Sequence, residues 1–585
     1  MLAVVAAVAG AIWAAAQIVP GTAEKPVAMA AMLPQGALLS IESPDFGALL
    51  HDWERSPEQA AWMKSDSYGM FSRSRLFGRL SEAQEQFAGA AGMAADGGFL
   101  DEIAGTDSIF AWYDIGKLEF LYITRLAPGK AEQTRLMQSR SSFSERQAGG
   151  ATFYVRTRGD DPRTVAFAVS GDYLLLATRE DLMASALALR AHSSNDSLAT
   201  EPWFMDAGKA ATVGSQTPAL RMALDLDRIV KTPYFRSYWV ERNVSEMNQY
   251  RAAMVDLYRE PSQMREERVL LPKSVEDAGA SQAELGELAA LAPARAAVYR
   301  AVATGDAAVA EAALEEKLLR RGPTAYVDTR VAPSVDLTGQ ETGSASDLET
   351  RIDAAPLAAA KPEDQTEQGE RMQLLRAQMA ATGVVGVLTV DSNEAGETDA
   401  GGGMWVPLHS AVVIRAAKAW DEVAVAGGLE QVLEPELSAG ALGLGWTRVG
   451  RQGGYESLGQ VRPLQMAVRG DLLLVADDAA LMEAILARVG TAVPAAPMEA
   501  RLVGGFDHDA AAGGFARLSE LIDGAEAGGD ARRARGPGTE GSTPAFFSAD
   551  LAGLSRTFAA MKSERVVERQ DGAVMRQTVT YVWQR

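Results

Sequence analysis

Residues 165–190 read VAFAVSGDYLLLATREDLMASALALR, and residues 464–489 read LQMAVRGDLLLVADDAALMEAILARV. Aligned without a gap, about eleven of roughly 26 positions are identical, which indicates an internal duplication. In each copy an apolar strand runs into a Gly-Asp pair, at Gly171-Asp172 and Gly470-Asp471, which is typical of a tight hairpin turn. A second apolar strand and an amphipathic helix follow, so the stretch predicts a strand–turn–strand–helix unit that occurs twice.

Elements on either side of this unit also correspond between the two halves of the chain. The predicted strand Leu33–Ile41 runs into Ser43-Pro44-Asp45, where a serine cap and a proline in the first turn predict a helix start. The second half repeats this pattern before Thr304-Gly305-Asp306, and a later pair of strands aligns Arg125 with Arg415. We therefore expect an α+β fold of two tandem duplicated domains, each a mainly antiparallel sheet with packed helices.

The expected domain boundaries follow from this correspondence. A chain of 585 residues is too long for one hydrophobic core. Two segments of the second repeat, near 332–369 and 524–543, lack hydrophobic periodicity, and we predict that they are disordered insertions. The predicted order is a signal peptide or membrane anchor with its tether over 1–32, a first α+β repeat over 33–275, a linker over 276–287 and a second α+β repeat over 288–585.

Composition excludes several classes of function. Apolar residues make up 47% of the chain and charged residues 23%, as in folded globular proteins. The absence of cysteine excludes disulfides, thiolate nucleophiles, iron–sulfur clusters and cysteine zinc sites. Four scattered histidines argue against a histidine-rich metal site, and we predict no cofactor. A formal net charge of -21 argues against a nucleic-acid partner, because binding phosphates needs a clustered basic surface.

The beginning of the sequence predicts the location of the protein. Leu2–Val19 is an uncharged apolar stretch, long enough for a short membrane-spanning helix or for the core of a signal peptide. Pro20 and Gly21 end the stretch, and Gly21-Thr22-Ala23 fits a small-x-small cleavage site. We expect contact with the bacterial inner membrane through this helix, with the rest of the chain facing the periplasm, or secretion to the periplasm if the leader is cleaved.

Two acidic motifs are candidates for catalytic or metal sites. The segment Asp391–Gly396 begins like a calcium loop, but Ala395 and Gly402 stand where oxygen ligands are needed, so a hairpin loop is the better interpretation. Asp507-His508-Asp509 could supply carboxylates and an imidazole, but neighbours in an extended chain point to opposite faces. These aspartates, and the corresponding Asp225 and Asp227, are better interpreted as strand-end and helix-cap residues. We predict no catalytic, cofactor-binding or metal-binding residue.

The segment Tyr234–Tyr258 is unusually aromatic and is predicted to be helical. Its aromatic residues fit either core packing or, if exposed, a partner-binding or membrane-proximal surface. The possible partner-binding residues are Tyr234, Phe235, Tyr238 and Trp239.

Short motifs near the start of the chain carry a resemblance to a known family. They are Leu33-Pro34, Glu42-Ser43-Pro44-Asp45 and the Gly-Asp hairpin with its following Leu-Met helix. With these motifs the order of elements resembles an uncharacterised domain family of exported or membrane-anchored bacterial proteins. The second half departs from the pattern, with Ala292-Pro293 in place of Leu-Pro. The family implies no reaction, cofactor or catalytic residue.

Three functions agree with these observations. The first is a non-enzymatic cell-envelope protein that binds or scaffolds a partner, because the sequence shows an anchor, a duplication and no reactive constellation. The second is a carboxylate-based hydrolase, for which Asp225, Asp227, Asp507 and Asp509 are the first candidates. The third is a carrier of an apolar ligand in the envelope, which requires a large apolar cavity between sheet and helices.

Overall fold

The structure is a computed structural model, and it divides into two compact units that are described separately. Unit 1 comprises Met1–Ala278, Gln340–Ala355 and Gly572–Gln577, and unit 2 comprises Gly279–Gly339, Pro356–Asp571 and Thr578–Arg585. The residues that the structure describes are 28–56, 75–94, 96–157, 163–211, 216–232, 247–260, 263–273, 282–294, 298–319, 372–393, 408–438, 445–450, 454–458, 464–491, 498–507 and 561–583, with a few short pieces between these ranges.

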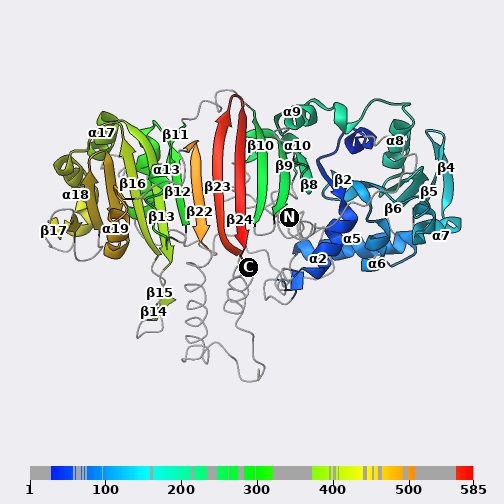
Figure 1. Cartoon of the computed structure of the whole chain (residues 1–585), viewed down its shortest axis with the longest axis horizontal. Coiled ribbons are helices and arrows are strands. Elements are labelled where there is room, and N and C mark those ends of the chain that lie inside the picture. Colours follow the sequence, from blue (N-terminus) through cyan, green and yellow to red (C-terminus); the bar gives the residue numbers. More distant parts are fainter. Residues whose placement is uncertain are drawn as a thin grey trace, which may run out of the picture. The chain divides into compact units, whose positions relative to one another are not determined.

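Unit 1 is built on ten antiparallel strands (Figure 1). Their order across the sheet is β10-β9-β8-β1-β2-β3-β7-β6-β5-β4, and each neighbouring pair is antiparallel. The strands are β1 (Leu39–Asp45), β2 (Thr106–Asp114), β3 (Glu119–Arg125), β4 (Ser144–Ala148), β5 (Ala151–Thr157), β6 (Thr164–Ser170), β7 (Tyr173–Ala177), β8 (Leu220–Asp225), β9 (Tyr250–Glu260) and β10 (Gln263–Pro272).

Helices cover both faces of the central strands of unit 1. Because side chains alternate along a strand, β2 sends Ile109 and Ala111 to one face and Phe110 and Trp112 to the other. The first face packs on α8 and on a short 3-10 helix, η1, in one buried cluster. The second face packs against α5 and α6 in another cluster. The helices are η1 (Met29–Met32), α2 (Phe46–Arg55), α5 (Arg75–Ala91), α6 (Gly97–Ile103), α7 (Arg135–Gln138), α8 (Glu180–Arg190), α9 (Pro202–Ala211) and α10 (Leu226–Ile229).

The Gly-Asp hairpin joins β6 to β7, and Gly171 adopts a positive φ of 58° that favours glycine. The carbonyl oxygen of Asp172 accepts a hydrogen bond of 2.9 Å from the backbone N–H of Leu126, and its carboxylate lies 3.8 Å from the Arg125 guanidinium. The turn is therefore fixed to the end of the neighbouring strand β3.

Nine further strands of the twenty-stranded sheet lie wholly in unit 2, and a tenth, β24, begins in residues of unit 1 and continues in unit 2 from Thr578. The nine follow the order β23-β22-β12-β13-β16-β20-β19-β18-β17, all antiparallel. The strands are β12 (Val298–Ala303), β13 (Val384–Asn393), β16 (Leu408–Ala416), β17 (Thr447–Val449), β18 (Tyr455–Leu458), β19 (Leu464–Arg469), β20 (Leu472–Ala476), β22 (Leu502–Asp507), β23 (Met561–Asp571) and β24 (Val574–Trp583).

The second Gly-Asp hairpin, between β19 and β20, makes the same contacts as the first. Gly470 has a φ of 62°, and the carbonyl oxygen of Asp471 accepts a 2.9 Å hydrogen bond from the N–H of Ala416. The carboxylate of Asp471 lies 3.9 Å from the guanidinium of Arg415. Helices cover both faces here too: α14 (Ala307–Leu314), α17 (Gln373–Thr382) and α18 (Glu422–Ser438) contribute to one buried cluster, and α13 (Gly286–Ala289) and α19 (Ala479–Leu486) to another.

The predicted fold class is wrong in its organisation. The described strands do not group into one sheet for each predicted repeat: twenty of them belong to one antiparallel sheet. Pairing satisfies backbone groups that an open sheet edge leaves exposed, and the alternation within a strand does not reveal whether its edge is paired. Two tandem duplicated domains are therefore not shown, although the hairpin contacts recur.

The predicted N-terminal membrane or signal helix, Leu2–Val19, lies outside the described residues. In the part of the chain that the structure describes, no helix is both long and apolar enough to cross a membrane. The segments near 332–369 and 524–543, predicted to be disordered, also lie outside it.

Two local predictions are corrected by tertiary contacts. Ser43 does not cap a helix: it ends up inside β1, and Asp45 caps α2 by accepting a 2.8 Å hydrogen bond from the N–H of Ala48. The second part of the predicted aromatic helix is strand β9, because Tyr250–Glu260 pairs with β8 on one side and β10 on the other. Ladder pairing on both edges overrides the helical spacing of the aromatic residues.

Replacing the hairpin glycine Gly470 by alanine should destabilise the protein by about 1 kcal/mol, because an L-residue is strained in the left-handed conformation. A Cβ atom at this position meets nothing within 4 Å, so the cost is that of the backbone alone. The matched control is Gly427→Ala in α18, where the space is also open and alanine should stabilise the helix by about 0.5–1 kcal/mol. Urea unfolding midpoints that shift in the same direction for both variants would contradict this account.

Candidate functional site: an apolar cavity in unit 1

The candidate site is a cavity of about 480 Å³ in unit 1, between one face of the sheet and the helices α2, α5 and α6. Strands β1, β2 and β3 form its floor, and β7 and β8 each add one leucine. Its volume falls within the range of small-molecule sites in proteins. The lining residues are Ile41, Ser43, Phe46, Leu80, Ala83, Gln84, Phe87, Phe99, Leu100, Ile103, Ser108, Phe110, Trp112, Leu118, Phe120, Tyr122, Arg163, Leu176 and Leu220.

Aromatic rings form most of the sheet side of the cavity. The Phe110 ring centroid lies 5.3 Å from that of Trp112, with the rings nearly perpendicular, and 5.3 Å from that of Phe120. These three side chains are only half-buried, although they face the interior of the unit between sheet and helices. Their rings therefore line open space instead of filling it, and they are available to a ligand.

Helices α5 and α6 supply the opposite wall. The buried rings of Phe87, on α5, and Phe99, on α6, lie 6.0 Å apart, and Phe87 reaches to 6.2 Å from Phe120 on the sheet. Leu100 is 44% exposed although it lines the cavity, which places it at the mouth.

A short chain of hydroxyl groups satisfies the polar atoms of the floor. The buried Tyr122 hydroxyl donates a 2.8 Å hydrogen bond to the carbonyl oxygen of Ile103, at the end of α6, and contacts Ser108 Oγ at 3.3 Å. Ser108 Oγ in turn lies 2.6 Å from Thr124 Oγ1. Burial raises the pKa of Tyr122 to about 12, so its hydroxyl stays protonated at neutral pH. The floor offers no ionised group to a ligand.

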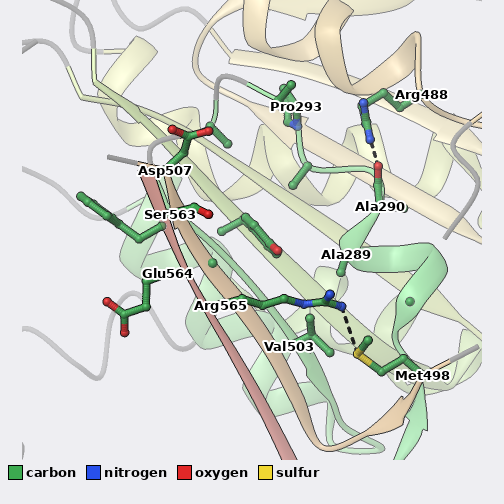
Figure 2. A pocket seen from close by; sticks show the side chains of 17 residues that line it. Ala289, Ala290, Pro293, Arg488, Met498, Val503, Asp507, Ser563, Glu564 and Arg565 are labelled. Atoms are coloured by element: carbon green, nitrogen blue, oxygen red, sulfur yellow. Dashed lines mark hydrogen bonds between the residues drawn. The ribbon is translucent and has the colours of Figure 1, made fainter. Parts of the chain in front are cut away.

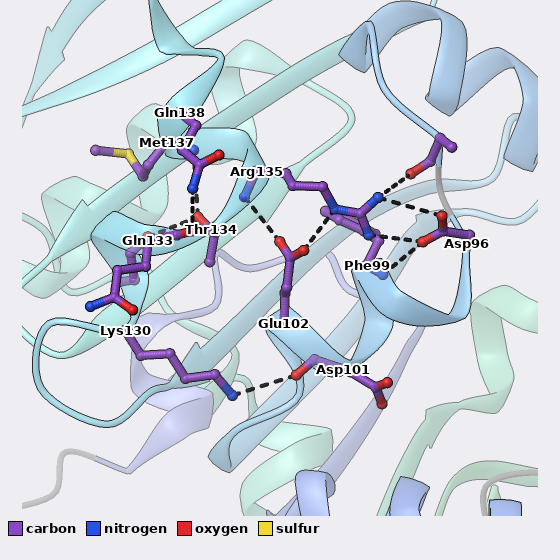
Figure 3. Close-up of polar contacts among 12 residues, drawn as sticks. Asp96, Phe99, Asp101, Glu102, Lys130, Gln133, Thr134, Arg135, Met137 and Gln138 are labelled. Carbon is purple, nitrogen blue, oxygen red and sulfur yellow. Dashed lines mark hydrogen bonds and ion pairs between the residues drawn. The ribbon is translucent and has the colours of Figure 1, made fainter.

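Helix α6, which contributes three lining residues, is held by an ion-pair cluster outside the cavity (Figure 3). Arg135 donates from Nη2 to the carboxylate of Asp96 at 2.8 Å and from Nε to Glu102 at 2.7 Å, and its backbone N–H donates to Glu102 at 2.9 Å. Asp96 also caps α6 by accepting a 2.9 Å hydrogen bond from the N–H of Phe99. Arg135 therefore binds residues at both ends of the seven-residue helix α6.

The lining of the cavity includes one arginine, Arg163. Arg163, just before β6, donates from Nε and Nη2 to the side-chain oxygen of Gln86 at 3.0 and 2.9 Å. Its Nη2 also donates to the carbonyl oxygen of Lys117 at 3.2 Å, in the turn between β2 and β3. Arg163 is the one charged side chain among the described residues that line this cavity.

A second cavity, of about 350 Å³, lies in unit 2 and is lined in part by Asp507 (Figure 2). Arg488 Nε donates to the carbonyl oxygen of Ala290 at 2.6 Å. The strand register pairs Asp507 with Ser563 and Phe506 with Glu564, and the two carboxylates point in different directions in Figure 2. This cavity does not bring two carboxylates together.

Two of the four hydrolase candidates, Asp225 and Asp227, are engaged in a helix cap and in ion pairs. Asp225 caps α10 by accepting from the N–H of Arg228 at 3.1 Å and also binds its guanidinium, and Asp227 pairs with Lys273 at 2.9 Å. Asp507 ends β22 in unit 2, whereas Asp509 lies outside the described residues. Asp391, from the calcium-like segment, contacts Lys317 and Ser410; Asp391–Asn393 end strand β13, and residues 394–396 lie outside the described part. Within the described residues, no group of three or more acidic or histidine side chains could hold a metal ion.

Sequence reasoning did not identify the cavity. The aromatic residues that it selected, Tyr234, Phe235, Tyr238 and Trp239, lie outside the described residues. A usable signal was present in β2, where apolar residues occupy both faces and the aromatic ones alternate with Ile109 and Ala111. This pattern predicts a strand covered on both sides, but it does not predict whether the cover fills the space.

The corresponding face in unit 2 is packed differently. There the strand side chains of β13 and β16 are aliphatic and buried, as in Val387, Val412 and Ile414, and α17 and α18 fill the space above them with Leu375, Met379, Val425 and Leu429. Aliphatic side chains of this size interdigitate well, whereas the rings of unit 1 leave a cavity.

Comparisons with known proteins do not identify a family. No protein-family model matches the sequence, and no curated protein sequence matches it. A solved structure titled "Structure of crystal form I of TP0453" is similar to 41% of this chain and 77% of its own, at 13% identity and a TM-score of 0.24. A likeness at that level carries no structural argument, and the suspected family is not confirmed.

Replacing Arg135 by methionine should reduce the loss of stability at acid pH. The hydrogen bond from Arg135 lowers the pKa of Asp96 below its usual range, so this carboxylate stabilises the fold above that range and the contribution is lost as the pH falls through the lowered pKa. The urea midpoint of the wild type should therefore fall more between pH 7 and pH 3 than that of Arg135→Met. Arg146→Met, which removes an exposed arginine of the same unit, should behave like the wild type. Equal pH dependence of Arg135→Met and the wild type would contradict the assignment.

Proposed function

We propose that the protein is a non-enzymatic cell-envelope protein whose first unit binds an apolar ligand in the cavity between the sheet and helices α5 and α6. The observation that supports this proposal most directly is the half-buried aromatic surface of Phe110, Trp112 and Phe120, which lines a cavity of about 480 Å³. Apolar surface that remains uncovered between packed elements gains free energy when a ligand removes it from water.

The size of the cavity limits the ligand. An engineered cavity of about 150 Å³ holds one benzene molecule, so a cavity roughly three times larger accommodates about 12 to 18 carbon atoms. Each methylene group buried from water contributes about 0.8 kcal/mol. A chain of about ten buried methylenes thus gains about 8 kcal/mol, from which several kcal/mol are lost to the entropy of association. We expect dissociation constants in the micromolar range or weaker.

The chemistry of the lining favours binding over catalysis. The described lining residues include no carboxylate and no histidine, and the hydroxyl groups of Ser108 and Tyr122 are engaged with other protein atoms. General acid–base catalysis needs a titratable group within reach of the reacting atoms. Among the described lining residues, Tyr122 could serve as such a group, but its hydroxyl is bound to Ile103 and stays protonated at neutral pH, which supports a carrier and not a hydrolase.

The placement in the cell envelope rests on Leu2–Val19, the apolar stretch at the beginning of the sequence. An apolar ligand of this size occurs in or near membranes, so a binding unit that follows a membrane or signal helix would meet it there. Contact with the membrane through that helix remains part of the proposal.

The test of this function is binding of the neutral fluorescent probe N-phenyl-1-naphthylamine to the full chain. Wild-type protein should bind about one equivalent in unit 1 and enhance its fluorescence, whereas Ala83→Trp, which places an indole in the cavity, should weaken binding at least ten-fold. Glu85→Trp is the matched control, because Glu85 is exposed on the same helix and does not line the cavity. Equal binding by both variants, or no binding by the wild type, would refute the proposal.

A further inference from the structure

The C-terminal end of α6 is fixed to the rest of unit 1 through its backbone. The Tyr122 hydroxyl donates to the carbonyl oxygen of Ile103 at 2.8 Å. The carbonyl oxygen of Gly105, just after the helix, accepts from the N–H of Phe46 at 3.0 Å. A Cβ atom at Gly105 would lie 2.2 Å from the carbonyl oxygen of Arg125, so the chain passes directly against the end of β3 here. This end of α6 cannot leave the sheet without breaking hydrogen bonds to buried groups.

The N-terminal end of α6 is attached mainly through one arginine (Figure 3). Gly97 and Gly98 form its first turn, and glycine lowers helix stability more than any other residue except proline. Among the described residues, Arg135 is the one donor outside α6 that binds the Asp96 carboxylate, at 2.8 Å from Nη2. Its guanidinium also lies 5.7 Å from the centre of the Phe99 ring. The position of this end therefore depends on Arg135 and on the packing of Phe99.

The residues near this end form part of the cavity wall. Phe99 is buried and Leu100 is exposed at the mouth, and both line the cavity. If the N-terminal end of α6 swings away from the sheet, both side chains leave the wall while Ile103 stays in place. Such a movement breaks the contacts of Arg135 with Asp96 but keeps the hydrogen bonds at the C-terminal end of the helix. It is therefore the movement of α6 that opens the cavity with the smallest loss of polar contacts.

Water reaches the contact between Arg135 and Asp96. The Asp96 side chain is 56% exposed and the Arg135 side chain 32%. Water and salt screen an ion pair with this exposure, so the pair contributes little free energy and breaks and re-forms readily. A contact of this strength keeps α6 in place without preventing the passage of a ligand.

Resting on the proposed function, we infer that α6 is a lid over the cavity, hinged at Ile103–Gly105 and held closed at its N-terminal end by the pair of Arg135 and Asp96. This pair sets how often the lid opens, and therefore the rates at which a ligand enters and leaves. Neither residue lines the cavity, so both are positioning residues that act through Phe99 and Leu100.

The inference is tested by stopped-flow binding of N-phenyl-1-naphthylamine to the full chain. Asp96→Asn keeps the helix cap, because asparagine caps as well as aspartate, but loses the ionic contact with Arg135. Its association and dissociation rates should both rise about three- to ten-fold, with a dissociation constant within about two-fold of the wild type. Glu102→Gln is the matched control, since it removes the same charge from the same arginine at the hinged end. Its two rates should stay within about two-fold of the wild type.

Hydrogen exchange of the α6 amides in the absence of ligand gives a second measurement. The amides of Phe99 and Leu100 should exchange about three- to ten-fold faster in Asp96→Asn than in Glu102→Gln, because only the first variant frees the N-terminal end of the helix. Equal exchange in the two variants would contradict the placement of the hinge.

The possible results separate the two proposals. If the probe binds and Asp96→Asn has the rates of the wild type, or Glu102→Gln raises both rates as much, the lid is overturned while the binding function stands. If Asp96→Asn raises the dissociation rate alone, Asp96 stabilises the wall of the occupied cavity, and the lid is again overturned. If the wild type does not bind the probe, the proposed function fails, and the lid fails with it even where the α6 amides exchange as expected.

Discussion

The structure of unit 1 depends on one constraint: its central strands carry apolar side chains on both faces, so both faces must be covered. Ile109 and Leu121 are fully buried against the side of α8, while Phe110 and Phe120 point to the side of α5 and α6. On the first side the buried cluster consists mainly of aliphatic residues, methionines and alanines. On the second side the cover consists of aromatic rings and a short helix, and large flat side chains leave a cavity where smaller branched ones would interdigitate.

The polar side chains near the cavity are bound to other protein atoms and do not face the cavity as free groups. The floor hydroxyls of Tyr122, Ser108 and Thr124 satisfy one another and the end of α6, so that the buried surface presents no unpaired acceptor to an apolar chain. Arg135 contacts α6 on the side away from the cavity, and Arg163 is the one charged side chain among the described residues of the lining.

Part of the fold could be predicted from the sequence. The Gly-Asp hairpins form at Gly171 and Gly470 because a left-handed turn between two apolar strands leaves few alternatives to glycine. The alignment that placed Arg125 opposite Arg415 corresponds to two arginines in equivalent contact with the turn aspartates. The prediction of a helix over Tyr250–Tyr258 was wrong, because hydrogen bonds to β8 and β10 decide the conformation there. The cavity could not be predicted, since its walls come from segments between Ile41 and Leu220 that meet only in the fold.

The sequence by itself determined the local units: hairpins, the helix cap Asp225, and strands with two apolar faces. These depend on the spacing of residues along a few turns or one strand, which is visible in the chain order. Only the tertiary structure decided that twenty strands belong to one sheet, that Asp225 and Asp227 form a cap and ion pairs, and that the aromatic face of β2 borders a cavity whose lining includes Arg163. Edge pairing and the volume left between packed side chains depend on distant segments together, so no local pattern encodes them.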